Sequence, residues 1–158
     1  MRLLAIDPGN KQSGYVLFEH KPFELLEAGD VPNPELRKII RRVQPHCNYM
    51  AIEEPTVIGQ KFMQTDVMEA AVETGRFIQC FGLDLATIRL YRRNVLLTLF
   101  GRVNVQKADT QVKALIRLNF GEVGSPKKPG PLIKLRGLNH AWQALGCGLA
   151  ALEQEVSF

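Results

Sequence analysis

The chain has 158 residues and a net charge of +4, with 46% hydrophobic and 23% charged residues, which is typical of a soluble globular protein with a sizeable core. We therefore expect a single domain over residues 1–158. The sequence has no run of about eighteen apolar residues, and MRLLAID lacks a signal-peptide pattern, so membrane and secreted proteins are disfavoured and a cytoplasmic location is expected.

The N-terminal third predicts a three-stranded antiparallel meander. RLLAID is a short apolar run that ends in an acid and Pro-Gly, as a buried strand does where it meets a loop. GYVLFE and PFELLEAGDV also have strand character, with turns at DPGNKQSG and EHKP.

A helix and a central strand come next. PNPELRKIIRRVQP has apolar residues at helical spacing between Leu36 and Val43, with Asn33 as the expected N-cap and Pro45 after the helix. NYMAIEEP is an apolar run that ends in acids and a proline, which predicts a central strand. A Gly-interrupted helix is expected from about Phe62 to Cys80.

The remaining chain predicts one strand and three helices. DLATIRLY is strand-like, NVLLTLF and KADTQVKALIRLNF are helical with Asp109 as a possible cap of the second, and NHAWQALGCGLAALEQE is a last helix. GEVGSPKKPGP between them is expected to be a flexible basic loop. This order of elements predicts an α/β fold with a mixed sheet.

Charge and cysteines limit the chemistry. Residues 89–136 contain eleven Lys or Arg and two acids, so this segment is either a solvated basic surface or a face that binds a polyanion such as nucleic acid. Cys47, Cys80 and Cys147 lack CxxC or Cys/His spacing, which predicts reduced, mostly buried thiols rather than disulfides or a zinc site.

Two apolar strands end in acids, at Asp7 and at Glu53 or Glu54. If these strands are neighbours, the acids converge, and an acid at the end of a buried strand is costly unless a cation compensates it. Carboxylate oxygens suit Mg²⁺ or Mn²⁺ better than zinc. Either acid alone is more simply a solvated turn residue.

Polar groups also begin the last helix. His140 and Gln143 are three residues apart in LNHAWQALG and therefore share a helix face, apart from the leucine stripe that begins at Leu145. His140 is either a functional group or a core histidine. DPGNKQSG could approach a phosphate, as in nucleotide-binding folds of the actin and sugar-kinase type, or simply form a loop around Gly9 and Gly14. For a two-lobed nucleotide clamp, 158 residues are too few.

Four segments in this order, AIDPGNKQSGY, AIEEP, LYRRNV to NVQKADTQVKALI, and NHAWQALGCGLAAL, resemble the RuvC-type Holliday junction resolvases over nearly the whole chain, most closely the versions carried by phages. The resemblance implies a ribonuclease H-like α/β fold, with a mixed five-stranded sheet flanked by helices. It also implies a crossover junction endodeoxyribonuclease of DNA recombination and repair that uses Mg²⁺ or Mn²⁺. Such an enzyme is a homodimer in a bacterial or phage-infected cytoplasm and has no membrane partner.

Site residues follow from the resemblance position by position. Asp7 matches the first catalytic acid and Glu53 the second, which makes Glu54 a bystander. His140 matches a position that the family fills with His or Asp, and Gln143 stands where the last aspartate is expected. The resemblance thus implies that the metal ligands and catalytic groups are Asp7, Glu53, His140 and Gln143.

Gln143 departs from the family pattern, because an amide oxygen can bind Mg²⁺ but brings no charge or basicity. Three explanations are open: a natural variant that works through His140, an inactive form, or compensation by another acid, which would be Glu54, Glu73 or Asp109. The family mechanism uses two cations about 3.5 to 4 Å apart, so metal binding should weaken here.

Positive residues supply the remaining expected contacts. Lys107 lies where the resemblance places a catalytic basic residue beside the scissile phosphate, or it is an ordinary surface lysine. Phe62 stacks on a base at the crossover or belongs to the core. The DNA-binding candidates are Lys61, Phe62, Gln64, Arg89, Arg92, Arg93, Arg102, Lys113, Arg117, Lys127, Lys128 and Lys134.

The expected reaction is hydrolysis of four-way DNA junctions by paired symmetric nicks that leave 5′-phosphate and 3′-hydroxyl ends. Three alternatives remain: a junction-binding protein with weak or no nuclease activity because of Gln143, a general nuclease for flaps and forks, and a small nucleotide-binding module built on the DPG turn.

Overall fold

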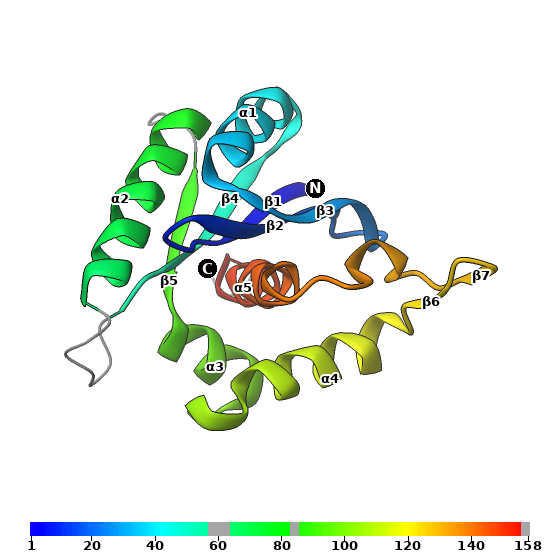
Figure 1. Cartoon of the computed structure of the whole chain (residues 1–158). Coiled ribbons are helices and arrows are strands. Elements are labelled where there is room, and N and C mark those ends of the chain that lie inside the picture. Colours follow the sequence, from blue (N-terminus) through cyan, green and yellow to red (C-terminus); the bar gives the residue numbers. More distant parts are fainter. Residues whose placement is uncertain (57–63, 83–85, 156–158) are drawn as a thin grey trace.

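One mixed five-stranded sheet organises the structure, a computed structural model that describes residues 1–56, 64–82 and 86–155 (Figure 1). β1 (Arg2–Asp7), β2 (Gln12–Glu19) and β3 (Glu24–Pro32) form the expected antiparallel meander. β4 (Tyr49–Glu54) pairs parallel with β1, and β5 (Thr87–Tyr91) pairs parallel with β4, which gives the strand order β3-β2-β1-β4-β5. This architecture confirms the predicted fold class.

Helices cover both faces of this sheet (Figure 1). α1 (Asn33–Val43) and α2 (Gln64–Phe81) pack on one face, and α5 (His140–Glu155) packs on the other. α3 (Arg92–Phe100) and α4 (Ala108–Phe120) lie against α5 on its outer side. The short 3-10 turns are η1 (Gln44–His46), η3 (Val105–Lys107) and η4 (Ile133–Leu135).

The alternation of side chains along β1 divides the core into two parts. Leu4 and Ile6 point toward α1 and α2, whereas Leu3 and Ala5 point toward α5. All four are completely buried. Because successive strand residues face opposite sides of a sheet, Asp7 continues the Leu3 and Ala5 series and belongs to the α5 face.

Helix α5 lies unusually close to the sheet because its inner surface consists of small residues. A Cβ atom added to Gly148 would lie 2.9 Å from the Cβ of Ala5 and 2.9 Å from Cε1 of Phe18. The neighbouring Ala141, Ala144 and Ala151 are fully buried. This close packing holds the start of α5 against the ends of the central strands.

Several local expectations were wrong. Asn33 does not cap α1, which begins at Asn33 after Pro32, because its buried amide instead binds the loop after β1. Asp109 does not cap α4 through its side chain, because the carboxylate pairs with Arg92. The expected basic loop contains a small hairpin of β6 (Gly124–Ser125) and β7 (Lys128–Pro129).

Two further findings concern thiols and membranes. Cys147 is buried as predicted, whereas Cys47 and Cys80 are only partly buried. Within the described ranges, no helix combines the length and the apolar character that crossing a bilayer would require.

Candidate active site

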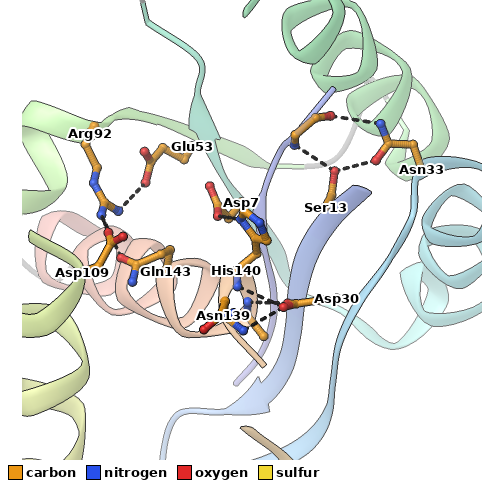
Figure 2. Close-up of polar contacts among 12 residues, drawn as sticks. Asp7, Ser13, Asp30, Asn33, Glu53, Arg92, Asp109, Asn139, His140 and Gln143 are labelled. Carbon is orange, nitrogen blue, oxygen red and sulfur yellow. Dashed lines mark hydrogen bonds and ion pairs between the residues drawn. The ribbon is translucent and has the colours of Figure 1, made fainter. Parts of the chain in front are cut away.

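Asp7 and Glu53 lie beside each other at the ends of two neighbouring strands. β1 and β4 run parallel with Ile6 opposite Ile52, so the next residue on each strand is an acid on the α5 side of the sheet (Figure 2). Their side chains are 17% and 13% exposed. The expectation that the two acid-ended strands are neighbours is therefore confirmed.

His140, the first residue of α5, reaches Asp7 directly. Its Nδ1 lies 3.0 Å from Oδ2 of Asp7, and its side chain is 52% exposed. The hydrogen bond to Asp7 raises the pKa of His140 above its ordinary value of 6.5, although partial burial opposes this effect. The exposure contradicts the reading of His140 as a core histidine and leaves one side of the imidazole accessible.

Asp30 on β3 holds the start of α5 in place. Its Oδ2 accepts hydrogen bonds from the backbone N–H groups of Asn139 (2.7 Å) and His140 (3.1 Å), and its Oδ1 accepts one from Ala141 (2.8 Å). A carboxylate at a helix N-terminus satisfies free N–H groups and complements the helix dipole. Asp30 thereby fixes the position from which His140 reaches Asp7.

Gly14 on β2 makes this approach possible. A Cβ atom at Gly14 would lie 2.2 Å from the carbonyl carbon of His140 and 2.5 Å from the backbone nitrogen of Ala141. Any side chain would push α5 away from the sheet. The glycine that could have indicated phosphate binding serves instead to bring His140 close to β1.

Two buried side chains hold the loop that follows Asp7. The Ser13 hydroxyl accepts a hydrogen bond from the Gly9 N–H (3.0 Å) and donates one to Oδ1 of Asn33 (2.7 Å). Nδ2 of Asn33 donates to the carbonyl oxygens of Gly9 (3.0 Å) and Asn10 (3.1 Å). This network gives the loop a defined conformation beside the acids (Figure 2).

Arg92, at the start of α3, binds the other acid. Its Nη1 donates to Oε2 of Glu53 (3.2 Å), and its Nη2 donates to Oε1 of Gln143 (2.9 Å) and to Asp109 (Figure 2). The Arg92 side chain is only 15% exposed. Gln143 is buried. On the helix face that His140 and Gln143 share, His140 contacts the Asp7 carboxylate and Gln143 contacts the Arg92 guanidinium.

Burial dominates the electrostatics of Glu53. The pKa of Glu53 is raised to about 7: burial is the largest cause, Arg92 opposes the shift, and the nearby Asp7 adds to it. Burial also raises the pKa of the Cys147 thiol well above its usual range. A carboxyl that is difficult to ionise next to a second carboxylate is a typical feature of a site that accepts additional positive charge.

The acids considered as substitutes for the aspartate that the resemblance leads us to expect at position 143 differ in position. Glu54 pairs with Arg89, and Glu73 pairs with Arg37 and Arg76 between α1 and α2, so both are engaged elsewhere. Asp109 alone of the three joins the centre, through Arg92. Its side chain is largely exposed.

The basic candidates fall into two groups. Arg93, Arg102, Lys127 and Lys128 are exposed, as is Lys107 at the end of η3, and no contact between Lys107 and the acids is observed in the part of the chain that the structure describes. The others already have intramolecular partners: Arg89 with Glu54, Arg92 with Glu53, Lys113 with Asn139, Arg117 with Glu122 and the Trp142 ring, and Lys134 with the Leu25 carbonyl.

Three predicted DNA contacts are not tested. Lys61 and Phe62 lie outside the described residues, and Gln64 is the first residue of α2 with a side chain that lies outside the description. An open hollow of about 390 Å³ adjoins the acids, lined among others by Pro8, Glu53, Thr56, Asp66 and Arg92. A larger hollow of about 640 Å³ lies along α2, away from Asp7 and His140.

The acids and the histidine are the groups of this site that could bind a divalent ion. Within the described ranges, no preformed group of three or more His, Cys, Asp or Glu side chains stands ready to hold a metal. Asp7 and Glu53 nevertheless offer carboxylates on adjacent strands, which is the ligand type that Mn²⁺ and Mg²⁺ prefer, and His140 adds a ring nitrogen beside Asp7. The oxygen of Gln143, in contrast, is already bound by Arg92.

Two residues of this site were missed or misassigned from sequence. Asp30 gave no local signal, because it caps a helix that begins 110 residues later in the chain. From the sequence, Arg92 was expected to contact phosphate, together with the other Lys and Arg candidates. Its position directly after β5, the neighbour of β4, was the available sign that it could reach Glu53.

No family model and no curated protein matches this chain. Among solved structures, it is similar to "T. thermophilus RuvC in complex with Holliday junction substrate", with a TM-score of 0.66, 16% identity, and coverage of 98% of this chain and 94% of that chain. The "Thermus thermophilus RuvC structure" has a TM-score of 0.61 and 20% identity, with coverage of 99% and 96%. At these identities the likeness is one of fold, and the chain has the ribonuclease H-like fold of RuvC.

Proposed function

We propose that this protein is a metal-dependent endonuclease that resolves four-way DNA junctions by paired symmetric nicks. The observation that carries the proposal is the meeting of Asp7, Glu53 and His140 at the ends of β1, β4 and the start of α5. The similarity in fold to a RuvC protein whose structure includes a Holliday junction supports the same substrate class.

Asp7, Glu53 and His140 would hold the divalent ion, Mg²⁺ or Mn²⁺. When bound, such an ion would supply Lewis acidity for the activation of a water molecule and for the charge on the departing oxygen. The proposed products are a 5′-phosphate and a 3′-hydroxyl.

The protein's own groups orient the reaction. In the metal-free protein, Asp7 accepts the hydrogen bond of His140 and sets the direction of the imidazole. His140 then serves either as a metal ligand or as the group that takes or gives a proton at the reacting phosphate, and not as both at once. Arg92 keeps Glu53 oriented through one donor and Gln143 through the other. Lys107, which is exposed, can neutralise charge on the scissile phosphate once DNA is bound.

Exposed Lys and Arg side chains would contact the DNA backbone and position it without reading its sequence. Arg93, Arg102, Lys127 and Lys128 are the candidates that remain exposed in the structure.

A homodimer is part of the proposal because two symmetric nicks need two centres. Met68 and Val72 are 68% and 54% exposed on α2 beside the 640 Å³ hollow and offer an apolar patch for a second copy. A monomer at all concentrations in sedimentation velocity would contradict this part.

The test compares a labelled four-way junction, a fork and a linear duplex in EDTA, Mg²⁺ and Mn²⁺. We expect selective binding of the junction in EDTA and nicking when metal is added. Asp7→Asn should bind the junction and fail to nick it, with a loss of at least about a hundredfold in rate, because a ligand and the partner of His140 are removed together. Equal affinity for linear duplex would contradict a junction resolvase, and equal cleavage of forks would favour a general branched-DNA nuclease.

A second candidate function is junction binding without robust cleavage. The contact between Gln143 and Arg92 favours it, because a neutral amide bound to a guanidinium replaces an expected metal ligand. Gln143→Asp separates the two: binding without nicking in the natural chain and nicking only in Gln143→Asp would establish the binding protein.

A further inference from the structure

Arg92 connects three elements at the centre of the acidic site. It begins α3 directly after β5, and its guanidinium bonds to Glu53 on β4, Asp109 on α4 and Gln143 on α5. With 15% of the side chain exposed, the charge is largely withdrawn from solvent. A surface residue waiting for a phosphate would be expected to have both guanidinium Nη atoms free, whereas both Nη atoms of Arg92 already bond to side-chain oxygens.

The bonding pattern of Arg92 resembles that of a cation bound between oxygen ligands. A guanidinium is permanently charged and presents several donors in one plane, so it can bridge two or three oxygen acceptors at once. Here the acceptors are Oε2 of Glu53, Oε1 of Gln143 and a carboxylate oxygen of Asp109. Glu53 and Gln143 are two of the four groups expected to bind metal.

Gln143 is matched to this arrangement. An aspartate at position 143 would add a second buried negative charge beside Glu53, which a second divalent ion could balance. The neutral amide instead accepts a hydrogen bond from Arg92 at 2.9 Å and leaves Arg92 to balance Glu53. The substitution and the arginine thus form one unit.

We infer that Arg92 is a resident cation that replaces one of two divalent ions, so that each chain binds a single metal ion, through Asp7, Glu53 and His140. Arg92 is a positioning residue in this arrangement, because it acts through Glu53 and Gln143. The inference rests on the proposed function, since it concerns the metal demand of the same centre.

The test is the titration of Mn²⁺ into the protein without DNA, followed by isothermal calorimetry and by the electron paramagnetic resonance signal of free Mn²⁺. The natural chain should bind one Mn²⁺. Arg92→Gln should bind Mn²⁺ about tenfold more tightly or better, because a positive charge that contacts Glu53 is removed. Arg92→Gln combined with Gln143→Asp should bind two ions.

Two further variants serve as controls. Arg136→Gln removes the same charge at an exposed side chain outside the proposed DNA contacts and should leave both the stoichiometry and the affinity of Mn²⁺ binding unchanged. Arg92→Lys retains the positive charge without the planar guanidinium and should still bind one ion. It keeps the inference testable if Arg92→Gln fails to fold. Circular dichroism and thermal unfolding of every variant check that it is folded.

Two Mn²⁺ ions in the natural chain, or one ion with unchanged affinity in the double variant, would overturn the inference and leave the proposed nuclease standing. Absence of Mn²⁺ binding in all variants would contradict both the inference and a metal-dependent reaction. The first set of results overturns the inference alone and the second overturns the metal-dependent reaction as well, so the two failures are distinguishable. Selective binding of the four-way junction in EDTA does not depend on metal and would persist in the second case.

Discussion

The Asp7–His140 pair is the most informative contact at the scale of single residues. The His140 nitrogen lies 3.0 Å from the Asp7 carboxylate, which favours the protonated imidazole and raises its pKa. An imidazole that keeps its proton at higher pH cannot ligate a metal, and under the proposed function it would instead donate that proton to a leaving oxygen. The protonation state of one side chain therefore links pH to the chemistry of the centre.

We predict that His140 titrates above pH 6.5 in the metal-free protein and that Asp7→Asn lowers its pKa toward that ordinary value. Because the folded pKa exceeds the unfolded one, the stabilisation from this pair is fully present below about pH 6.5 and is lost as the pH rises through the folded pKa. NMR titration of the imidazole C–H signals in EDTA measures the shift.

His20 provides an internal control for this titration. Partial burial, the largest cause, lowers the pKa of His20 below 6.5, and its position is independent of Asp7. The His20 signal should be the same in both proteins. An identical His140 pKa in the natural chain and in Asp7→Asn would show that the pair does not form in solution.

At the scale of elements, the start of α5 depends on residues from the N-terminal meander. Asp30 on β3 supplies the cap, and Gly14 on β2 leaves room for the helix backbone. The helix contributes both His140 and Gln143, so its position relative to the sheet decides whether they meet Asp7 and Arg92. A change at β3 should therefore be felt at the opposite end of the sequence.

We expect Asp30→Ala to lower the free energy of unfolding by about 2 kcal/mol and Asp30→Asn by about 1 kcal/mol, because three backbone N–H groups lose all or part of their acceptor. Urea denaturation followed by circular dichroism measures the change. Glu69→Gln, at an exposed position on α2, removes the same charge and should have little effect. Equal stability of the natural chain and Asp30→Ala would exclude a capping role.

Much of this arrangement follows from local sequence patterns, and the rest depends on contacts between distant segments. Apolar runs and helical apolar patterns predict the five strands and the main helices. The acids at two strand ends were expected to meet only if those strands are neighbours, and the choice of Glu53 over Glu54 came from the resemblance. Asn33, Asp109 and Arg92 were placed by local rules as a cap, a cap and a phosphate contact, whereas each is bound to a residue at least 17 positions away. Such partners are set by packing, which a local pattern does not contain.

At the scale of the whole molecule, positive charge is concentrated on one side of the sheet. The basic segment 89–136 includes α3, α4 and the β6–β7 hairpin, which extends away from the sheet beyond the end of α4 (Figure 1). Lys127 and Lys128 on this hairpin are exposed. Under the proposed function, this projecting basic hairpin is a candidate contact for a second arm of the junction.

We predict that Lys127→Gln with Lys128→Gln weakens binding to a four-way junction by about tenfold at moderate salt. The slope of the logarithm of the binding constant against the logarithm of the salt concentration should also become smaller by about two, because two fewer counterions are released. Fluorescence anisotropy in EDTA over a series of salt concentrations measures both. Lys38→Gln with Arg41→Gln, on exposed positions of α1 on the other face of the sheet, is the matched control. An equal loss in both pairs would indicate unspecific attraction.

The close seating of α5 has a consequence for the order of events during synthesis on the ribosome. Residues 140–155 cover the centre of one face of the sheet and bring two of the four central polar groups, yet they are translated after every strand of that sheet. Until they leave the exit tunnel, Leu3, Ala5 and Phe18 lack the cover that α5 provides. The nascent chain therefore lacks a complete candidate site, and exposes the apolar face of its sheet to solvent, until helix α5 emerges.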